Sequence, residues 1–576
     1  MRAVIDDPDI PSDVEVAVEH QIPRTSKRVD FMIAGADSSD NSNVVVVELK
    51  QWDKAEKVDD IMLHSVRAFT GGAYRIVNHP SYQAYAYATF IKNSSEQVQD
   101  DHIGIWPCAY LHNCDPVTRE PLDDEIYRLW YEEAPLFAKT QALKLRSFIK
   151  QFISKKSSSG DLLFKIDNGR IKPSKALQDC IVSLMKGNKE FILLDDQAVV
   201  FDMCKKIMDQ CRKDMKKRTI IVQGGPGTWK SVLAVNLLKE FIVKGLNASY
   251  CTKNSAPREA YQRLLAKSDL KAQVNIKQLF RSPFALCNAA PNFYDCLLVD
   301  EAHRLVAKMY GDWNGEKQIK ECINASLFTV FLIDEDQQIT TKDIGSIAEI
   351  KKWASALGSH VTMNPETVLH SQFRCNGSDQ YIQYVNNLLQ IGEYVDIDFE
   401  DLHFDIRVFD DPNEMRDELR RINQVNNKAR MVAGYCYDWD VKNNRGDYDI
   451  FLKNGFKAQW NLAADKIWAI NPKSFEQVGC IHTAQGLEFD YVGVLIGNDL
   501  RYDPVEGKVI TDKTKISKDD NSSGIRTAPD AVAARLIKNT YKTLLTRGQK
   551  GCFIYCEDEA LAAYIRSLLW KKGMEH

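Results

Sequence analysis

The segment from Gly224 to Ser231 constrains the fold of this chain more than any other stretch. It reads Gly224-Gly225-Pro226-Gly227-Thr228-Trp229-Lys230-Ser231 and lies between the apolar runs 219–223 and 232–238. A strand, a glycine-rich turn and a helix beginning with Lys-Ser can hold nucleotide phosphates, because backbone N–H groups and the helix N-terminus converge on the anion. The usual pattern has glycine directly before the lysine, where this chain has Trp229. If the turn needs a left-handed backbone there, a side chain costs about 1–2 kcal/mol.

Composition places this motif in a multidomain globular protein. The chain has 576 residues, of which 44% are hydrophobic and 27% are charged, and a net charge of −4. No apolar run approaches the roughly 20 residues that span a bilayer, and the N-terminus lacks a signal-peptide pattern, so we expect a cytoplasmic protein without a membrane partner. The 14 cysteines form no Cys-x-x-Cys pair, which favours buried reduced thiols. Lysine and arginine gather in 144–175 and 205–218, either as nucleic-acid tracks or as solvated helix faces.

Three residues near the N-terminus suggest a second chemistry. The runs 14–19, 28–33 and 44–50 are predicted strands, and the last of them ends with Glu48 and Lys50 on one face. Asp30 comes from the strand before it. Two carboxylates can hold a magnesium ion and a lysine can orient water for phosphodiester hydrolysis, whereas the alternative interpretation is a surface salt bridge.

The predicted helix that begins near His79 contains two further residues that suggest a family resemblance. Gln83 and Tyr87 are four residues apart and share a helix face. With Asp30, Glu48 and Lys50, they make residues 14–112 resemble the PD-(D/E)xK nuclease superfamily, in particular its branch with a Gln-x-x-x-Tyr helix. The resemblance implies that Asp30 and Glu48 bind Mg²⁺, or Mn²⁺ in its place, that Lys50 is catalytic, and that Gln83 and Tyr87 support the site or the DNA backbone. A helix with a further glutamate before the first strand is missing, and Glu15 and Glu19 are the fallback candidates.

A pair of acidic residues downstream of the phosphate loop could complete a nucleotide site. The predicted strand 294–299 ends in Asp300 and Glu301, which suit a magnesium–nucleotide site: Asp300 near the cation and Glu301 polarising the hydrolytic water. The next predicted strand, 328–333, leads to Gln337, which could sense the γ-phosphate.

Two arginines are expected to come from a second lobe. Arg374 follows a short apolar segment, and Arg547 precedes the predicted strand 551–556. Between them, the run 481–490 leads into the predicted strand 491–496 and contains the remaining candidates for this lobe. Arginines from one lobe that meet a phosphate loop on another stabilise charge at the γ-phosphate only when the lobes close. Lobe closure would then sense ATP.

In this order the motifs resemble those of a superfamily 1 helicase-like P-loop ATPase, of an uncharacterised bacterial branch related to the Schlafen-type ATPase module. That resemblance covers about residue 191 to the end. It implies that Gln197 contacts adenine, although a polar residue starting a helix is the alternative, and that Ser231 and Asp300 bind Mg²⁺. The candidate ATP-binding residues are Gln197, Gly224, Gly225, Pro226, Gly227, Thr228, Trp229, Lys230, Ser231, Gln337, Gln485, Gly486 and Glu488.

The predicted fold class is α/β, with a PD-(D/E)xK nuclease-like mixed sheet, a helical connector and two RecA-like parallel lobes. The expected domains are residues 1–115, 116–190, 191–345 and 346–576, in that order. The resemblances imply an ATP-dependent DNA translocase or helicase fused to a magnesium-dependent nuclease, acting in phage defence, restriction or repair. Its partners would be nucleic acid, DNA in preference to RNA, and a partner protein or a second copy of the chain. The alternative is a nucleotide-gated nucleic-acid-binding switch or scaffold with little ATP turnover, which Trp229 favours.

Overall fold

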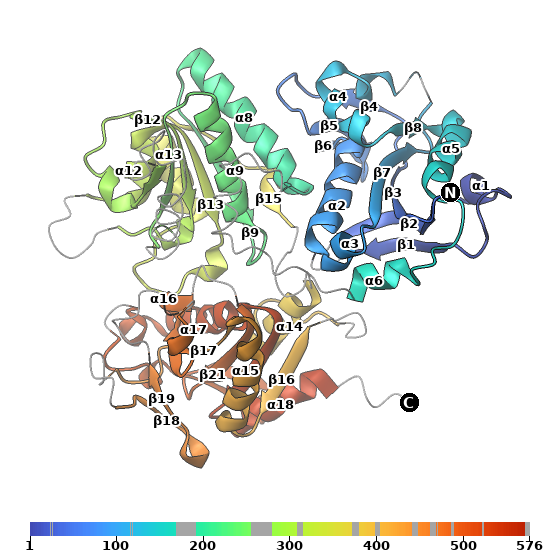
Figure 1. The fold of residues 1–576 in the computed structure, drawn as a ribbon. Coiled ribbons are helices and arrows are strands. Elements are labelled where there is room, and N and C mark those ends of the chain that lie inside the picture. Colours follow the sequence, from blue (N-terminus) through green and yellow to red (C-terminus); the bar gives the residue numbers. More distant parts are fainter. Residues whose placement is uncertain are drawn as a thin grey trace.

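The chain folds into three α/β units that follow one another in sequence (Figure 1). An N-terminal unit is drawn blue to cyan, a middle unit green to yellow, and a C-terminal unit orange to red. No helix among the described residues has the length and apolar character needed to cross a membrane. The computed structural model describes residues 1–22, 25, 27–115, 117, 119–168, 192–254, 258, 279–307, 315–370, 379–397, 404–439, 447–460, 468, 471–484, 489–520 and 523–570.

A five-stranded mixed sheet forms the centre of the N-terminal unit, with strand order β1-β2-β3-β7-β8. The pairs β1–β2 and β2–β3 are antiparallel, whereas β3–β7 and β7–β8 are parallel. Helix α2 packs on β3 and β7, and helix α5 packs on β3 and β8. The elements are α1 Arg2–Ile5, β1 Glu15–Gln21, β2 Arg28–Ala36, β3 Ser42–Lys50, α2 Pro80–Ser94, α3 Glu96–Asp100, β7 Gly104–Leu111, α4 Arg128–Glu133, β8 Leu136–Ala138, α5 Ala142–Phe152 and α6 Leu162–Asn168.

Strand β3 is apolar on both faces because both faces are covered. Val44 and Val46 belong to the core that contains residues of α2, and Val45 and Val47 belong to the core that contains residues of α5. A strand buried on both sides needs a continuous apolar run rather than an alternating one. The strand predicted over 44–50 is therefore confirmed, and it ends with Glu48 and Lys50.

The N-terminal unit continues past residue 115, where the sequence predicted a helical connector to begin. Strand β8 extends the sheet beside β7, and α5 covers a face of it. Strand β8 has only three residues, and the apolar residues around it have the spacing of a helix, so the sequence does not predict a strand there. The described part of the expected connector therefore packs with the N-terminal sheet rather than standing between domains. A small antiparallel sheet completes this unit: β4 Ala55–Lys57, β5 Ser65–Thr70 and β6 Ala73–Asn78.

A parallel sheet forms the middle unit, called lobe 1 below. Its strand order is β11-β10-β12-β13-β9-β14, with β15 also paired to β9, and each of these pairs is parallel. The predicted strands of this lobe are confirmed. The elements are α8 Asp196–Asp214, β9 Arg218–Gly224, α9 Lys230–Val243, β10 Ala248–Thr252, β11 Phe280–Arg281, β12 Tyr294–Asp300, α12 Gln318–Ala325, β13 Ser326–Ile333, α13 Ile347–Ala356, β14 His360–Thr362 and β15 Val368–Leu369.

The C-terminal unit, lobe 2, has a second sheet with strand order β16-β24-β21-β17-β20-β19-β18. These pairs are parallel except for β18–β19 at the edge. Two parallel α/β lobes agree with the predicted RecA-like pair. The elements are α14 Asp379–Leu389, β16 Asp405–Phe409, α15 Pro412–Asn426, β17 Ala429–Ala433, β18 Ile450–Phe451, β19 Lys457–Trp460, β20 Gln477–Cys480, α16 Ile481–Ala484, β21 Phe489–Ile496, β22 Leu500–Asp503, β23 Lys508–Thr511, α17 Asp530–Leu545, β24 Gly548–Cys556 and α18 Glu559–Trp570.

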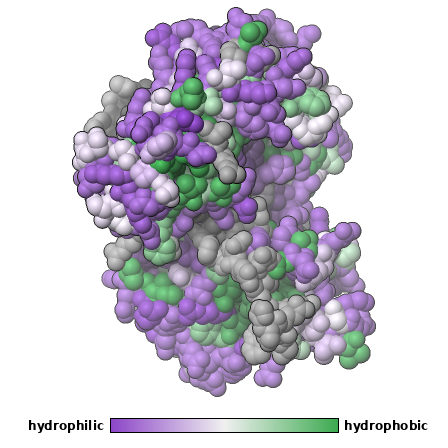
Figure 2. Space-filling model, turned by 90° about the vertical axis from the view of Figure 1, so that its right-hand side faces the viewer, coloured by the Kyte–Doolittle hydropathy of each residue, from purple (hydrophilic) through white to green (hydrophobic). Residues whose placement is uncertain are grey.

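The N-terminal unit docks on helix α8 of lobe 1. Asp202 on this helix is fully buried and binds across the junction: it accepts hydrogen bonds from the backbone N–H of His64 at 2.7 Å and from Ser65 Oγ at 3.1 Å. One hydrophobic core also runs through both units, joining residues of β2 and α2 to residues of α8 and α9. The outer surface is different in character, since the face in Figure 2 is mostly hydrophilic with small apolar patches. The docked units are therefore held by a shared core as well as by polar contacts.

The described cysteines are free and most are buried, as the sequence predicted.

Candidate ATP site and N-terminal carboxylate site

The phosphate loop connects β9 to α9 and has the tight backbone that its glycines predict. Gly227 has a φ of 84°, and a Cβ on Gly224 would lie 2.4 Å from Thr228 Oγ1. Trp229, the N-cap of α9, has φ 53° and ψ 37°, which is the left-handed region. This conformation is normally a glycine position, so the usual glycine of the motif is explained and Trp229 is strained.

Lys230 holds the loop closed from the first turn of α9. Its side chain is buried, and Nζ donates to the carbonyl oxygens of Gly224 at 2.7 Å and Gly225 at 2.8 Å. Thr228 Oγ1 also donates to Gly225 O, at 3.0 Å. The cationic group that would meet nucleotide phosphates therefore lies inside the loop.

The acid pair lies beside the helix start that follows the loop. Asp300, at the end of β12, accepts hydrogen bonds from Ser231 Oγ at 2.5 Å and from the hydroxyl of Tyr250. Burial and then the charge of Glu301 raise the pKa of Asp300. The oxygens of Ser231 and Asp300 are adjacent hard donors, which is the ligand type that Mg²⁺ prefers, so these residues fit the predicted magnesium site.

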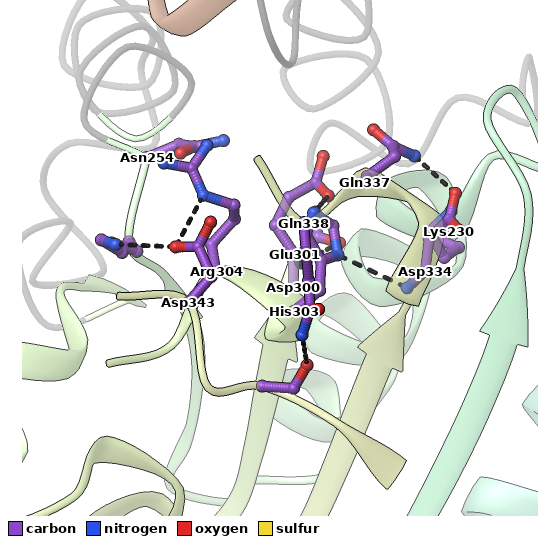
Figure 3. Close-up of polar contacts among 12 residues, drawn as sticks. Lys230, Asn254, Asp300, Glu301, His303, Arg304, Asp334, Gln337, Gln338 and Asp343 are labelled. Atoms are coloured by element: carbon purple, nitrogen blue, oxygen red, sulfur yellow. Dashed lines mark hydrogen bonds and ion pairs between the residues drawn. The ribbon is translucent and has the colours of Figure 1, made fainter. Parts of the chain in front are cut away.

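Glu301 has a left-handed backbone and lies beside a neutral histidine. It has φ 52° and ψ 45°, a left-handed conformation of the kind that clusters at functional sites. Burial lowers the pKa of His303 to about 3, so the imidazole is neutral near pH 7. His303 Nδ1 accepts from the backbone N–H of Asp334 at 3.4 Å, which leaves the proton on Nε2, 3.2 Å from Glu301 Oε2. Figure 3 shows these side chains converging above the strand ends of lobe 1.

Lobe 2 reaches this site through helix α17 and the residues that follow it. Arg547 is buried, and its Nη2 donates to Gln337 Oε1 at 3.2 Å. Gln337 Nε2 in turn donates to Asp334 Oδ2 at 2.7 Å. Asn539 Nδ2 donates to Gln338 O at 3.0 Å in the same junction. A chain of hydrogen bonds thus runs from the second lobe to the strand ends of the first, where the sequence placed Gln337 and Arg547.

Gln197 contacts the phosphate loop itself. Its amide is fully buried, with Nε2 donating to Thr228 O at 2.9 Å and Oε1 accepting from Leu194 N at 3.2 Å. The sequence predicted that it reads adenine or simply starts a helix. In the structure it lies in the first turn of α8 and joins that helix start to the loop.

Trp229 packs on the N-terminal unit. Its ring lies 6.4 Å, centre to centre, from that of Phe90 on helix α2, and it borders the core shared by the two units. The ring separation falls within the range in which aromatic pairs attract. The residue that departs from the phosphate-loop pattern is therefore a contact between the loop and another domain.

The three residues singled out near the N-terminus lie at adjacent ends of β2 and β3. Lys50 Nζ lies 2.5 Å from Glu48 Oε1, and Asp30 Oδ2 accepts from the Leu49 N–H at 2.7 Å. Glu48 is 2% exposed and the Lys50 side chain is 17% exposed, so the pair is largely buried and differs from the surface salt bridge that was the alternative. Burial raises the pKa of Glu48 to about 8. Burial acts to lower the pKa of Lys50, but Glu48 and the other nearby carboxylates raise it.

The chemistry of this cluster fits a cation held by few protein ligands. Glu48 Oε2 is buried and makes no hydrogen bond in the described structure. No three His, Cys, Asp or Glu side chains of the described chain are grouped so that they could hold a metal ion. Magnesium is commonly held by one or two carboxylates plus waters and substrate phosphates, and Asp30 with Glu48 supply that number. The fallback residue Glu15 is engaged elsewhere, accepting from the N–H groups of Leu162 and Leu163 at 2.8 and 2.9 Å.

The expected support residues lie beside this cluster, with one partner that the sequence missed. Gln83 Nε2 donates to the Tyr87 hydroxyl at 3.0 Å, and this hydroxyl donates to Asp195 Oδ2 at 3.0 Å. Asp195 also pairs with Lys27 Nζ at 2.9 Å. A cavity of about 540 Å³ is lined by side chains of both units, among them Lys27, Lys50, Gln83, Tyr87 and Asp195.

Four predicted site residues lie outside the described residues: Arg374, Gln485, Gly486 and Glu488. Asp195, Lys27 and Tyr250 were not predicted from the sequence. Tyr250 could have been found as a polar group on the strand next to β12, two residues before Thr252, which pairs with Asp300. No sequence pattern indicates that Asp195 and Lys27 belong to a site, because only the docking of lobe 1 on the N-terminal unit brings them together.

Comparison with known proteins places the lobes in a family. The profile of the Schlafen group 3, DNA/RNA helicase domain matches residues 217–558. An uncharacterized protein of Saccharomyces cerevisiae, YPL245W, is 23% identical over 412 residues, which cover 63% of this chain and 87% of the yeast protein. A chain from a structure of two coordinating Pif1 helicases on forked double-stranded DNA covers 64% of this chain and 97% of its own length at 10% identity, with a TM-score of 0.26, too low to establish a shared fold. Because the matched segment spans more than half of the 576 residues, the chain belongs to the Schlafen group 3, DNA/RNA helicase domain family.

Proposed function

We propose that this protein is an ATP-driven DNA translocase or helicase fused to a magnesium-dependent nuclease. The observation that carries the motor half is that Arg547 of lobe 2 donates to Gln337, which follows a strand end of the lobe 1 sheet. Lys230, Asp300 and Glu301 lie at or just after strand ends on the same edge of that sheet. Phosphoryl transfer is catalysed almost entirely by positioning and by charge stabilisation, and this set supplies both. Membership of a DNA/RNA helicase family supports nucleic acid as the polymer.

In the motor half, each residue has a defined task. Lys230 and the loop N–H groups would bind the β- and γ-phosphates of ATP, and Ser231 and Asp300 would hold Mg²⁺, which would supply positive charge against the phosphates. Glu301, which lies beside neutral His303, would polarise the attacking water. Gln337 accepts a hydrogen bond from Arg547 of lobe 2, so a γ-phosphate sensed by Gln337 would be linked to lobe position. Repeated closing and opening of the lobes would move the strand.

In the nuclease half, Asp30 and Glu48 bind the cation and Lys50 orients the attacking water or the phosphate. Magnesium, or manganese in its place, would supply a Lewis acid and lower the pKa of bound water. The free Oε2 of buried Glu48 supports this assignment, because an uncompensated buried carboxylate oxygen is costly unless a ligand satisfies it. Gln83 and Tyr87 hold the wall of the cavity next to Lys50.

A second candidate function is a nucleotide-gated nucleic-acid-binding switch with little turnover. The observation that favours it is Trp229, which holds a strained backbone at a glycine position and packs on another domain. A loop fixed in this way could bind ATP and change the affinity for nucleic acid without hydrolysing ATP rapidly. Background phosphate release with nucleotide-dependent DNA affinity would favour this reading over the motor. A role in phage defence, restriction or repair stays a prediction from resemblance.

The motor is tested by strand displacement. A fluorescent forked DNA duplex and its RNA equivalent are incubated with the full chain, ATP and Mg²⁺, with Glu301→Gln as the inactive variant. The matched control is Glu240→Gln, which removes a carboxylate paired with Lys244 at the far end of helix α9. We expect unwinding of DNA by the unmutated chain and by the control, and none by Glu301→Gln. Equal unwinding by Glu301→Gln would show that Glu301 has no catalytic role.

The nuclease is tested with plasmid and oligonucleotide substrates and Mg²⁺ or Mn²⁺. Loss of a residue that only supports a metal ligand typically costs about 10–100-fold in metal affinity or activity. Asp30→Asn and Lys50→Met remove a proposed ligand and a proposed catalytic group, so they should lose at least that much. Asp101→Asn is the control, because Asp101 pairs with Lys165 on the same unit outside the cavity. Cleavage that persists in Asp30→Asn and Lys50→Met would place the active site elsewhere.

A further inference from the structure

Asp195 belongs to lobe 1 in sequence but to the N-terminal site in space. It precedes helix α8, yet its carboxylate accepts from the Tyr87 hydroxyl and pairs with Lys27. Its side chain is only 16% exposed. It lines the same cavity of about 540 Å³ as Lys50 and Gln83. The cavity wall is therefore incomplete without a residue from the ATPase lobe.

The charge of Asp195 acts on the N-terminal cluster. Burial raises the pKa of Glu48 and acts to lower that of Lys50, and the negative charges of Asp30 and then Asp195 act to raise both. Lys27 pairs with Asp195 at 2.9 Å. Any displacement of Asp195 would change the field at Lys50 and free the hydroxyl of Tyr87.

The backbone of Asp195 is strained, and the peptide just before it is fixed by two contacts. Its φ is 43° and its ψ is −112°. Such conformations persist only where the surroundings impose them, and they often occur at switch regions. The peptide that joins Leu193 to Leu194 is bound by both units. Tyr82 of α2 donates to Leu193 O at 2.5 Å, and Leu194 N donates to Gln197 Oε1 at 3.2 Å.

Gln197 connects this strained turn to the phosphate loop. Its buried amide bonds both Leu194 N and Thr228 O, so the loop and the Asp195 turn share one side chain. A second connection is the contact of Trp229 with Phe90, because Phe90 lies on the helix that carries Gln83 and Tyr87. Packed contacts of this kind pass displacements on, since protein interiors have low compressibility.

We propose that nucleotide binding at the phosphate loop controls the N-terminal site, with Asp195 as a positioning residue that lobe 1 supplies to it. Thr228 and Trp229 lie in the loop that surrounds the phosphates, so a change in the loop displaces Gln197 and Phe90 together. The displacement reaches Asp195, Tyr87 and then Lys50. Cutting is thereby tied to the state of the motor. This inference rests on the proposed nuclease function for its consequence, but the physical coupling can be measured without it.

The first experiment measures cleavage by the full chain with Mg²⁺, with and without a non-hydrolysable ATP analogue. Coupling between sites in proteins typically changes affinity or activity by about 5–150-fold, and we expect a change of at least fivefold. Phe90→Leu should keep the cleavage rate measured without nucleotide and lose most of the response. Asp195→Asn should lower kcat more than it changes KM and should also lose the response, and Asp195→Glu should restore part of it. Asp101→Asn should behave as the unmutated chain.

The second experiment does not depend on cleavage. Hydrogen exchange of helix α2 and strand β3 is followed by mass spectrometry as the analogue is added. We expect slower or faster exchange in residues 80–94 and 42–50 of the unmutated chain, a reduced change in Asp195→Asn and Phe90→Leu, and none in Lys230→Ala, which loses the phosphate contact.

The outcomes separate the two claims. No cleavage in any state, together with nucleotide-dependent exchange in α2 that Asp195→Asn removes, would refute the nuclease and support the coupling. Cleavage that is indifferent to nucleotide, together with unchanged exchange in α2, would overturn the coupling and leave the nuclease standing. A nucleotide response that is identical in Asp195→Asn and the unmutated chain would overturn the role given to Asp195.

Discussion

Replacing Trp229 by glycine tests the contact between the phosphate loop and the N-terminal unit. Two effects oppose each other. Glycine relieves the left-handed strain at φ 53°, which favours the variant by about 1 kcal/mol. Removing the half-buried indole exposes roughly 100 Å² of apolar surface, about half of what an aromatic side chain buries, at a cost of about 2.5 kcal/mol. Loss of the ring pair with Phe90 costs about 1 kcal/mol more. We expect the free energy of unfolding to fall by about 2–3 kcal/mol.

The assay is urea denaturation of Trp229→Gly, Phe90→Leu and the double variant, followed by circular dichroism. A double-mutant cycle isolates the ring pair, and its coupling energy should be about 0.5–1.5 kcal/mol. As a control, Trp229→Gly combined with Phe409→Leu, whose ring packs on Phe553 in lobe 2, should be additive within about 0.5 kcal/mol. ATP should still bind to Trp229→Gly, because the indole contacts the N-terminal unit. A more stable Trp229→Gly with no coupling to Phe90 would refute this reasoning.

Three further predictions concern separate parts of the chain. Lys217 Nζ donates to Ile323 O, Asn324 O and Ser326 O at the end of α12, so Lys217→Met should lower the free energy of unfolding by about 1–3 kcal/mol in denaturant titrations; an unchanged midpoint would contradict this. Burial lowers the pKa of His79 to about 4 from 6.5, so the unfolded chain takes up a proton first as pH falls. The stability present above pH 6.5 should therefore decline by about 3 kcal/mol towards pH 4. His79→Asn, which puts an amide oxygen in place of the Nδ1 that accepts from the Ser81 N–H at the start of α2, should flatten that decline in unfolding measured across this range. Arg547→Ala should lower kcat for ATP hydrolysis by about 100-fold or more with little change in KM, as expected for a group that stabilises transition-state charge, and steady-state kinetics with equal kcat would refute it.

Local sequence patterns predicted the parallel lobes well. The strand predicted over 328–333 lies within β13, and the strand predicted over 294–299 ends in the structure at Asp300. Strands of this kind are buried on both faces, so their apolar runs are unmistakable and the polar residues at their ends mark the site. The resemblance of the lobes to the Schlafen ATPase module is confirmed by the family match, whereas the nuclease assignment stays a prediction.

Several tertiary contacts, within and between the units, could not be predicted from the sequence. Strand β8 has three residues and exists because β7 offers it a paired edge. Asp195 and Glu48 lie far apart in the chain and come into electrostatic contact only after docking. Trp229 looked like a defect in a motif because its partner, Phe90, belongs to a different unit. In each case the stabilising contact is between residues that are far apart in the chain. Local propensity and hydrophobic periodicity do not predict such contacts.

The central claim is that the two lobes form a nucleic-acid-directed ATPase, and phosphate release tests it most directly. The full chain is incubated with ATP and Mg²⁺, with and without single-stranded DNA or RNA, beside Lys230→Ala and Glu301→Gln. Lys244→Ala, on the surface end of helix α9, is the matched control for loss of a lysine. The account predicts that nucleic acid raises phosphate release severalfold in the unmutated chain and the control, and that release falls to background in Lys230→Ala and Glu301→Gln. Background release by the unmutated chain with every nucleic acid tested would contradict it.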